Sequence, residues 1–222
     1  AAGGFTLDYG PFGFCELFDP RFQPWTGGGM HFSFFNQPAA AGKNYQTFVS
    51  ALKPLLQDHP EAMTRLESLE EGFKAAMQEA LDSMWQRKLG LADHSPELVG
   101  ELLQLCVDSA ADYTMVFREL SAIPEQVATL KRSFYRPSDH QIDQRWMNWL
   151  QRWRHQLERN SDLSETSRSM QLTNPAITWR EWLIAPAYEQ AAHGDYSLVH
   201  ELQKVFAKPY ESLPMELADR YD

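Results

Sequence analysis

The chain has 222 residues, enough for one or two domains with a sizeable core. Its net charge of −10, from 30 acidic and 20 basic residues, disfavours nucleic acid and anionic membranes as partners, because both attract positive charge. No apolar run reaches the roughly 18–20 residues that span a bilayer, no secretory leader is recognisable and only two cysteines occur, so we expect a cytoplasmic protein without a disulfide scaffold.

Residues 1–42 differ in composition from the rest of the chain. They hold eight of the twelve glycines, interleaved with phenylalanines, which predicts a long loop pinned by aromatic side chains. Near its start, the strand-like lead Phe5-Thr6-Leu7 places Asp8 directly before a Gly-Pro turn. A carboxylate at the end of a rigid element suits a phosphate-bound metal ion, although an Asp in this setting is more often a turn-former.

From Asn44 onward the pattern is helical almost throughout. Pro60 begins a long helix that Gly90 ends after Leu89, Ser95 and Pro96 begin another, and Asp112 can cap a third. Later helices are expected at about 139–158, 174–192 and 196–207, with Asn174 and Pro175 as the N-cap and first residue of the second of these. The sequence therefore predicts a mainly α fold with little β structure.

One helical stripe is built from tryptophans. Trp146, Trp149 and Trp153 share a face of the helix predicted at 139–158, and arginines flank them. Aromatic and Arg side chains together also occur in nucleic-acid binding surfaces. The acidic total favours a core-facing stripe with solvated arginines beside it.

Other patterns that carry chemistry are weak. The seven histidines are scattered without the spacing of a zinc site, and Gly27-Gly28-Gly29 lacks the strand and helix that flank a phosphate loop. Glu16 and Asp19 are candidates for a second metal contact, but solvated turn carboxylates are the more frequent outcome. Cys15 lies among phenylalanines, where a packed thiol is more usual than a reactive one.

Ordered sequence blocks along nearly the whole chain resemble the selenoprotein O family, whose members have a kinase-like fold and look like protein adenylyltransferases. The blocks are Asp8-Tyr9-Gly10, Phe18-Asp19-Pro20-Arg21-Phe22, Asn36-Gln37-Pro38, Ala51-Leu52-Lys53-Pro54, Arg87-Lys88-Leu89-Gly90-Leu91, Asp112-Tyr113-Thr114, Phe117-Arg118-Glu119-Leu120-Ser121, Asn174-Pro175, Arg180-Glu181-Trp182-Leu183, Gly194-Asp195-Tyr196-Ser197 and Lys208-Pro209-Tyr210-Glu211.

The resemblance implies transfer of AMP from ATP to Ser, Thr or Tyr hydroxyls of other proteins. It makes Asp8 a ligand of Mg²⁺ or Mn²⁺ and, through the metal, of ATP. Residues 1–42 then carry the metal-binding Asp and an activation-segment-like loop. Residues 43–222 form the later part of a kinase-like C-lobe with a helical C-terminal extension.

The family's other active-site groups have no counterpart in this chain. Its glycine-rich loop, ATP-positioning Lys and catalytic Asp all precede the position of Asp8, so we assign no catalytic residue here. Because nucleotidyl transfer needs several charged groups, we expect this chain alone to be inactive. The position of a family cysteine in the activation segment reads Pro24 here, and the chain ends at Asp222 without another cysteine, so the resemblance leaves redox control of that kind open.

Two other functions remain open. The chain can be a non-catalytic helical domain that binds a partner protein, or part of a degenerate pseudokinase that binds nucleotide without turning it over. In a eukaryote, a mitochondrial location is the alternative to the cytoplasm.

Overall fold

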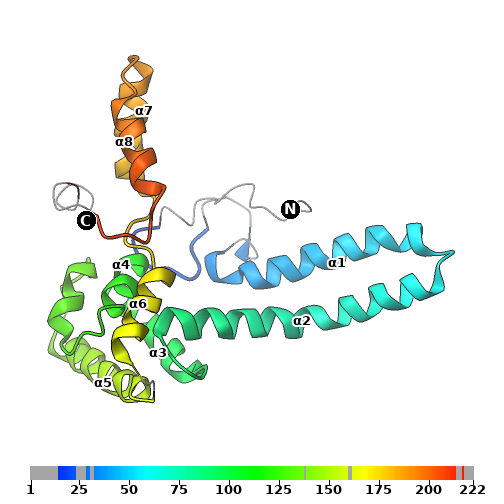
Figure 1. Ribbon diagram of the computed structural model, residues 1–222, viewed down its shortest axis with the longest axis horizontal. Coiled ribbons are helices and arrows are strands. Elements are labelled where there is room, and N and C mark those ends of the chain that lie inside the picture. Colours follow the sequence, from blue (N-terminus) through cyan, green and yellow to red (C-terminus); the bar gives the residue numbers. More distant parts are fainter. Residues whose placement is uncertain are drawn as a thin grey trace. The chain divides into compact units, whose positions relative to one another are not determined.

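A computed structural model describes residues 15–23, 29–30, 33–137, 139–159, 162–213 and 217 (Figure 1). Across these ranges the chain is mainly helical, and β pairing is limited to two isolated bridges, Leu17 with Asp112 and Ala111 with Phe134. The mainly α prediction is confirmed. The elements in chain order are η3 (Phe34–Asn36), α1 (Gln37–Leu56), α2 (Pro60–Leu89), α3 (Pro96–Asp108), α4 (Tyr113–Leu120), η4 (Val127–Ser133), α5 (His140–Leu157), α6 (Leu163–Thr173), α7 (Glu181–Ala192) and α8 (Ser197–Phe206).

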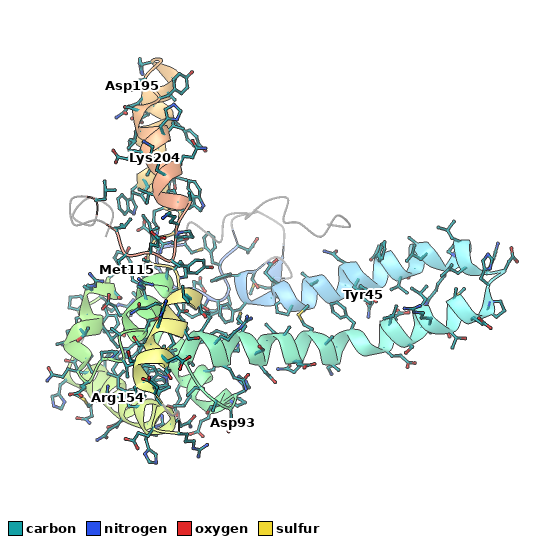
Figure 2. All side chains as sticks on the ribbon, viewed as in Figure 1. Tyr45, Asp93, Met115, Arg154, Asp195 and Lys204 are labelled. Carbon is teal, nitrogen blue, oxygen red and sulfur yellow. The ribbon has the colours of Figure 1, made fainter. Side chains whose placement is uncertain are left out.

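The chain forms two compact units, one of residues 19–84 and one of residues 85–222 with the chain up to Phe18. The smaller unit is dominated by α1 and the first part of α2, which lie side by side (Figure 1). Tyr45 of α1 stacks on Phe73 of α2 with ring centroids 4.6 Å apart (Figure 2). Of the described side chains on these two stretches, only Val49 and Leu66 are buried, so this helical hairpin has a thin apolar seam.

The core of the larger unit is built around the tryptophan stripe of α5, which packs against α3. Trp146, Trp149 and Trp153 are at most 1% exposed. Each indole N–H donates to a buried acceptor, namely Ser109 Oγ at 2.9 Å, Leu98 O at 2.8 Å and Leu89 O at 2.9 Å. A buried Trp needs such a partner because an unpaired donor in the core costs about 1–3 kcal/mol. The core interpretation of the stripe is confirmed.

The flanking arginines of α5 bind acidic groups of the same unit. Arg145 pairs with Asp108 at 2.6 Å, Arg152 with Glu97 and Glu101, and Arg154 with Glu125 at 3.1 Å. These cations are therefore already neutralised on the protein surface.

Several predicted helix boundaries agree with the structure, and two do not. The helices predicted from Pro60, from Pro96, at 139–158 and at 196–207 appear as α2, α3, α5 and α8, while α1 begins at Gln37 rather than near Asn44. The helix predicted over 174–192 is wrong in its first part. Asn174 is instead the C-cap of α6, its backbone is extended, and α7 begins only at Glu181.

Tertiary contacts explain why no helix begins at Asn174. Asn174 is fully buried and its side chain is hydrogen-bonded to residues far away in the sequence. The side chain is therefore not available to cap the backbone N–H groups of a helix that begins at Pro175. The helix α6 was not predicted because its sequence is rich in Ser and Thr; Asp162 starts it by accepting the N–H groups of Ser164 and Glu165.

Helices α7 and α8 pack against each other around a small separate core. Its buried members are Ile177, Leu183, Ala187, Leu202 and Val205, and Trp179 stacks on Phe206 with centroids 3.9 Å apart. Pro209 O accepts the N–H of Ala176 at 2.7 Å, which joins the segments entering and leaving this pair. Across the described residues, none of the helices is long and apolar enough to cross a membrane.

Candidate functional site

The central predicted residue, Asp8, lies outside the described residues, as do Pro24, Gly27, Gly28 and Asp222. Its role as a metal and nucleotide ligand therefore stays a prediction. The described site residues begin with the segment that follows it, Cys15–Phe18.

The three other candidate residues near Asp8 are Cys15, Glu16 and Asp19, and the structure describes all of them. Asp19 is exposed and its carboxylate accepts the backbone N–H of Arg21 at 2.8 Å, as expected of a turn carboxylate. Cys15 is half-buried. Glu16 is also half-buried, and its carboxylate accepts a hydrogen bond from Tyr135. Glu16 thus has a partner within the protein, and a metal contact from it stays a prediction.

The segment after Asp8 is fastened to the start of α4. Leu17 forms a β-bridge with Asp112, and the N–H of Phe18 donates to Ala111 O at 2.8 Å. The Phe18 ring, only 4% exposed, stacks on Tyr113 with centroids 5.2 Å apart. Two residues of this segment are therefore fixed by both backbone and side-chain contacts.

Asp112 is the residue around which this attachment is organised. One carboxylate oxygen, Oδ1, accepts the N–H of Met115 at 3.0 Å and so caps α4, close to where Met115 is labelled in Figure 2. The other, Oδ2, accepts from Arg180 Nη2 at 2.6 Å. The backbone N–H of Asp112 donates to Ser133 O at 2.8 Å. Both oxygens are engaged, so this carboxylate is a structural group and not a metal ligand.

The Asp112–Arg180 pair is almost completely removed from solvent. The two side chains are 2% and 7% exposed. A charge in such a place needs an opposite charge within bonding distance, since an unpaired buried ion costs several kcal/mol. Arg180 comes from the start of α7, so the pair links the C-terminal helices to the attachment point of Cys15–Phe18.

Tyr135 completes this arrangement. Burial, the negative charges of Asp112 and Glu16, and the hydrogen bond to Glu16 all raise the pKa of Tyr135, against an opposing effect of Arg180. The hydroxyl therefore stays protonated and donates to Glu16 at neutral pH. We call Glu16, Phe18, Asp112, Tyr135 and Arg180 the Asp112 corner. A small cavity of about 90 Å³ adjoins it, lined among others by Thr114, Thr178 and Trp182.

A second polar cluster lies within the same unit. Asn174 Nδ2 donates to Lys88 O at 2.8 Å and to Ser121 Oγ at 3.1 Å, and Asn174 Oδ1 accepts from Lys88 Nζ at 3.0 Å. Arg118 donates to the carbonyls of Gln171, Asn174 and Tyr210 at 3.0–3.3 Å. We call Lys88, Arg118, Ser121 and Asn174 the Asn174 hub.

Lys88 is the unusual charge of this hub. Its ammonium lies 4.2 Å from the centroid of the Phe117 ring and 5.3 Å from that of Tyr113, at cation–π distance. Burial lowers the pKa of Lys88 to about 8, because loss of water disfavours the cation.

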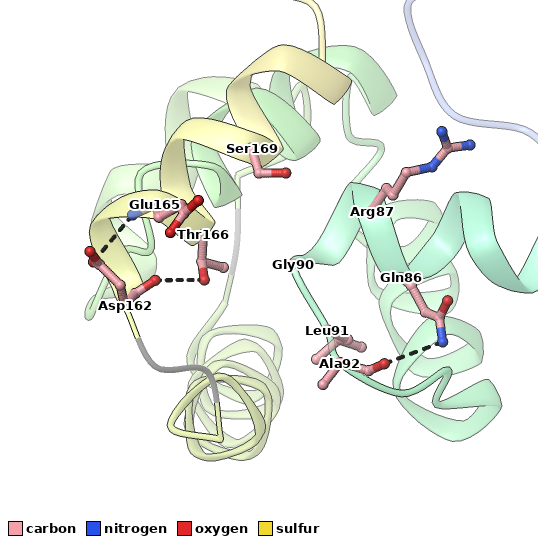
Figure 3. A pocket seen from close by; sticks show the side chains of 9 residues that line it. All are labelled: Gln86, Arg87, Gly90, Leu91, Ala92, Asp162, Glu165, Thr166 and Ser169. Carbon is pink, nitrogen blue, oxygen red and sulfur yellow. Dashed lines mark hydrogen bonds between the residues drawn. The ribbon is translucent and has the colours of Figure 1, made fainter.

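A cavity of about 470 Å³ lies between the end of α2 and the start of α6 (Figure 3). Arg87, Asp162, Glu165 and Ser169 are among its lining side chains. Gln86 and Ala92 are joined across one wall, and Asp162 caps α6 at the other. Gly90 lies between the walls. The cavity is open and mixed in charge, and none of the predicted metal or nucleotide ligands lines it.

These observations limit the chemistry that the described part of the chain can perform. Within it, no three His, Cys, Asp or Glu side chains gather in a way that could hold a metal ion. The corner and the hub are satisfied polar networks, which hold elements in place. From the sequence, Asn174 and Asp112 were interpreted only as helix caps, and neither Tyr135 nor the pairing of Asp112 with Arg180 was predicted. The available signal was that Asn174, Asp112 and Arg180 lie in the matched blocks.

Comparison with known proteins gives a consistent picture. A model of the family described as "Protein adenylyltransferase SelO" matches residues 2–207. Curated relatives named "Protein nucleotidyltransferase YdiU" include that of Methylorubrum populi, 30% identical over 95% of this chain and 44% of the relative. Those of Xanthomonas oryzae and Nitrosococcus oceani are 32% and 33% identical, over 94% and 93% of this chain. The chain spans less than half the length of these relatives.

Proposed function

The chain belongs to the protein adenylyltransferase SelO family, and from this premise we propose that the complete protein transfers AMP from ATP to Ser, Thr or Tyr hydroxyls of other proteins. The match over residues 2–207, which includes Asp8, is the observation that carries the proposal. The name of the relatives, nucleotidyltransferase, is consistent with it. In this reaction the hydroxyl oxygen bonds to the α-phosphorus and releases its proton, the bond from the α-phosphorus to the bridging oxygen breaks, and pyrophosphate leaves.

We propose that Asp8 holds Mg²⁺ or Mn²⁺ against the phosphates of ATP. A bound divalent ion supplies charge neutralisation for the leaving pyrophosphate. One carboxylate does not complete the coordination of such an ion, so we propose that other residues of the complete protein supply the remaining ligands.

The described helices then have a supporting role. We propose that they are the later part of a kinase-like C-lobe with a helical extension, following the activation-segment-like loop of residues 1–42. The backbone contacts of Leu17 with Asp112 and of Phe18 with Ala111 support this role, because they attach this segment to a buried part of the larger unit. Since one carboxylate does not make a transfer site, we propose that this chain by itself transfers nothing.

The test uses the full-length native protein with metal and ATP labelled at either the α- or the γ-phosphate. The key variant is Asp8→Asn, which removes the charge and keeps the shape. Asp19→Asn is the matched control, because Asp19 is an exposed turn carboxylate of the neighbouring block. We expect protein labelling from the α-position only, lost in Asp8→Asn and kept in Asp19→Asn.

Other outcomes separate the alternatives. Label from the γ-position alone would show an ordinary kinase. Without label from either position, ATP binding decides between the remaining two functions. Metal-dependent binding without transfer indicates a degenerate pseudokinase, and no binding indicates a helical partner-binding domain.

A further inference from the structure

Helices α7 and α8 form a pair that two non-helical connections, residues 174–180 and 207–212, join to the rest of the larger unit. The two helices pack mainly against each other, around a small core of their own. Trp179 of the first connection stacks on Phe206 at the end of α8. We call α7, α8 and these two connections the C-terminal arm.

Charged side chains at the two ends of α4 hold the arm. At its N-cap, Asp112 Oδ2 accepts from Arg180 Nη2 at 2.6 Å. In its last turn, Arg118 Nη1 donates to Asn174 O at 3.2 Å and to Tyr210 O at 3.3 Å. These two carbonyls belong to the two different connections, so both connections meet at the same helix.

The contact between the arm and α4 also contains empty space. The cavity of about 90 Å³ beside the Asp112 corner is lined by Thr114 and Met115 of α4 and by Ile177, Trp182 and Leu183 of the arm, among others. Trp182 is 47% exposed. Closely packed contacts resist displacement, because atoms fill the space on every side. A contact with empty space beside it offers less resistance.

The arm can change position without losing its own core. The buried members of that core, Ile177 to Val205, all come from the arm itself. The connections are short non-helical segments at helix ends, which is where the hinges of mobile elements lie. Rotation about them would therefore keep the contact between α7 and α8.

We propose that the C-terminal arm is a hinged element that rocks on α4, and that the buried Asp112–Arg180 pair is the contact that holds it in its docked position. Short charge-assisted hydrogen bonds tolerate little displacement, so the pair favours one position. When the arm moves away, both charges regain water, which offsets part of the cost of breaking the pair. This inference concerns the fold alone and does not rest on the proposed function.

The test measures distances between spin labels in the full-length protein, with its other reactive cysteines replaced by serine. Ala192→Cys at the end of α7 and Gln151→Cys on α5, both at exposed positions, report where the arm lies relative to the α3–α5 core. Gln104→Cys, at an exposed position of α3, with Gln151→Cys is the control pair within the core.

The key variant is Arg180→Lys, which keeps the charge but loses the planar guanidinium. Arg180 donates to Trp179 O and to Asp112. Arg154→Lys is the matched control, because Arg154 also donates to a backbone carbonyl and a carboxylate but lies outside the arm. We expect the population of displaced arms to rise about tenfold in Arg180→Lys, the effect of losing one charged hydrogen bond, and to stay at the wild-type level in Arg154→Lys.

A second variant acts through packing and leaves the ion pair in place. Thr114→Ile adds a carbon atom to the lining of the cavity and removes a hydroxyl. The docked arm then gains contacts, so we expect the arm–core distance distribution to become narrower than in the wild-type protein.

An arm–core distance that neither Arg180→Lys nor Thr114→Ile changes would overturn the inference. Equal broadening of the arm–core and core–core distances in Arg180→Lys would also overturn it, because the pair would then stabilise the whole unit and not the position of the arm. If Arg180→Lys does not fold, Thr114→Ile decides: a distribution as broad as that of the wild-type protein counts against a hinge.

Discussion

The α1–α2 hairpin and the α3–α5 core carry the same sequence signal and have opposite environments. Both show apolar residues at helical spacing. In α5 these residues are tryptophans that are at most 1% exposed. On the hairpin, Phe48 is 52% exposed and Leu55 is 72% exposed. Helical period predicts a helix, but the burial of its apolar face depends on how many other elements cover it.

The comparison predicts a large difference in stability when aromatic side chains are truncated. Trp153→Ala should lower the unfolding free energy of the larger unit by about 4 kcal/mol, from lost burial and the unpaired Leu89 carbonyl. Phe48→Ala on the hairpin should cost less than about 1 kcal/mol. Urea unfolding followed by circular dichroism measures both, and equal losses would contradict the difference in burial between the two regions.

The next largest effect is expected at the Asn174 hub. Asn174→Ala leaves Lys88 O, Lys88 Nζ and Ser121 Oγ without this partner, so a loss of about 3 kcal/mol is expected. Asn148, an exposed residue of α5 that accepts from Gln144, is the control, and its replacement by Ala should change stability by less than about 0.5 kcal/mol. If both variants unfold at the same urea concentration, the hub is not a structural centre.

Much of the fold follows from local patterns. Pro60, Pro96 and Asp112 mark helix starts by mechanisms that act within one turn, and these starts agree with the structure. The tryptophan stripe identifies the core for a similar reason, because three large rings on one face of a helix must be covered.

Features that depend on distant partners were not predictable in this way. An Asn-Pro pair fits a helix N-cap, yet Asn174 is used by Lys88 and Ser121, which are far away in sequence. Likewise, Asp112 was predicted as a cap, which is correct, but nothing in its neighbourhood indicated Arg180 as a partner. The matched blocks marked most of these residues without giving their contacts.

Lys88 makes the larger unit sensitive to pH. Its pKa of about 8 in the folded protein is below that of an unfolded lysine, so between these values the unfolded chain binds a proton that the folded chain lacks. Stability should therefore rise with pH, by up to about 2 kcal/mol from pH 8 to 9.5. Asn174 Oδ1 and the Phe117 ring favour the cation and reduce this rise.

Lys88→Met should remove that rise, and Lys131→Met, at an exposed lysine paired with Asp143, controls for the loss of a cation. Unfolding free energies at several pH values between 7 and 9.5 test this. A wild-type profile that Lys88→Met leaves unchanged would show that the hub does not titrate in this range.

The difference between the two regions can also be tested by adding a single methyl group at each of two glycines, one within α2 and one at its end. Gly90, at the end of α2 in the larger unit, has φ +67°, and a Cβ there would lie 2.7 Å from Met170 Sδ and from Thr166 Cγ2. Gly90→Ala should therefore destabilise by about 2 kcal/mol, because both the backbone conformation and the neighbouring side chains disfavour the added methyl group.

Gly72, in the hairpin part of α2, has nothing within 4 Å of its Cβ position. Gly72→Ala should stabilise by about 0.5–1 kcal/mol, since alanine restricts the unfolded chain and favours helix. The two variants are expected to shift the thermal midpoint in opposite directions. A destabilising effect of Gly72→Ala would mean that other atoms occupy the space beside Gly72. The hairpin would then not be the more exposed of the two regions at this position.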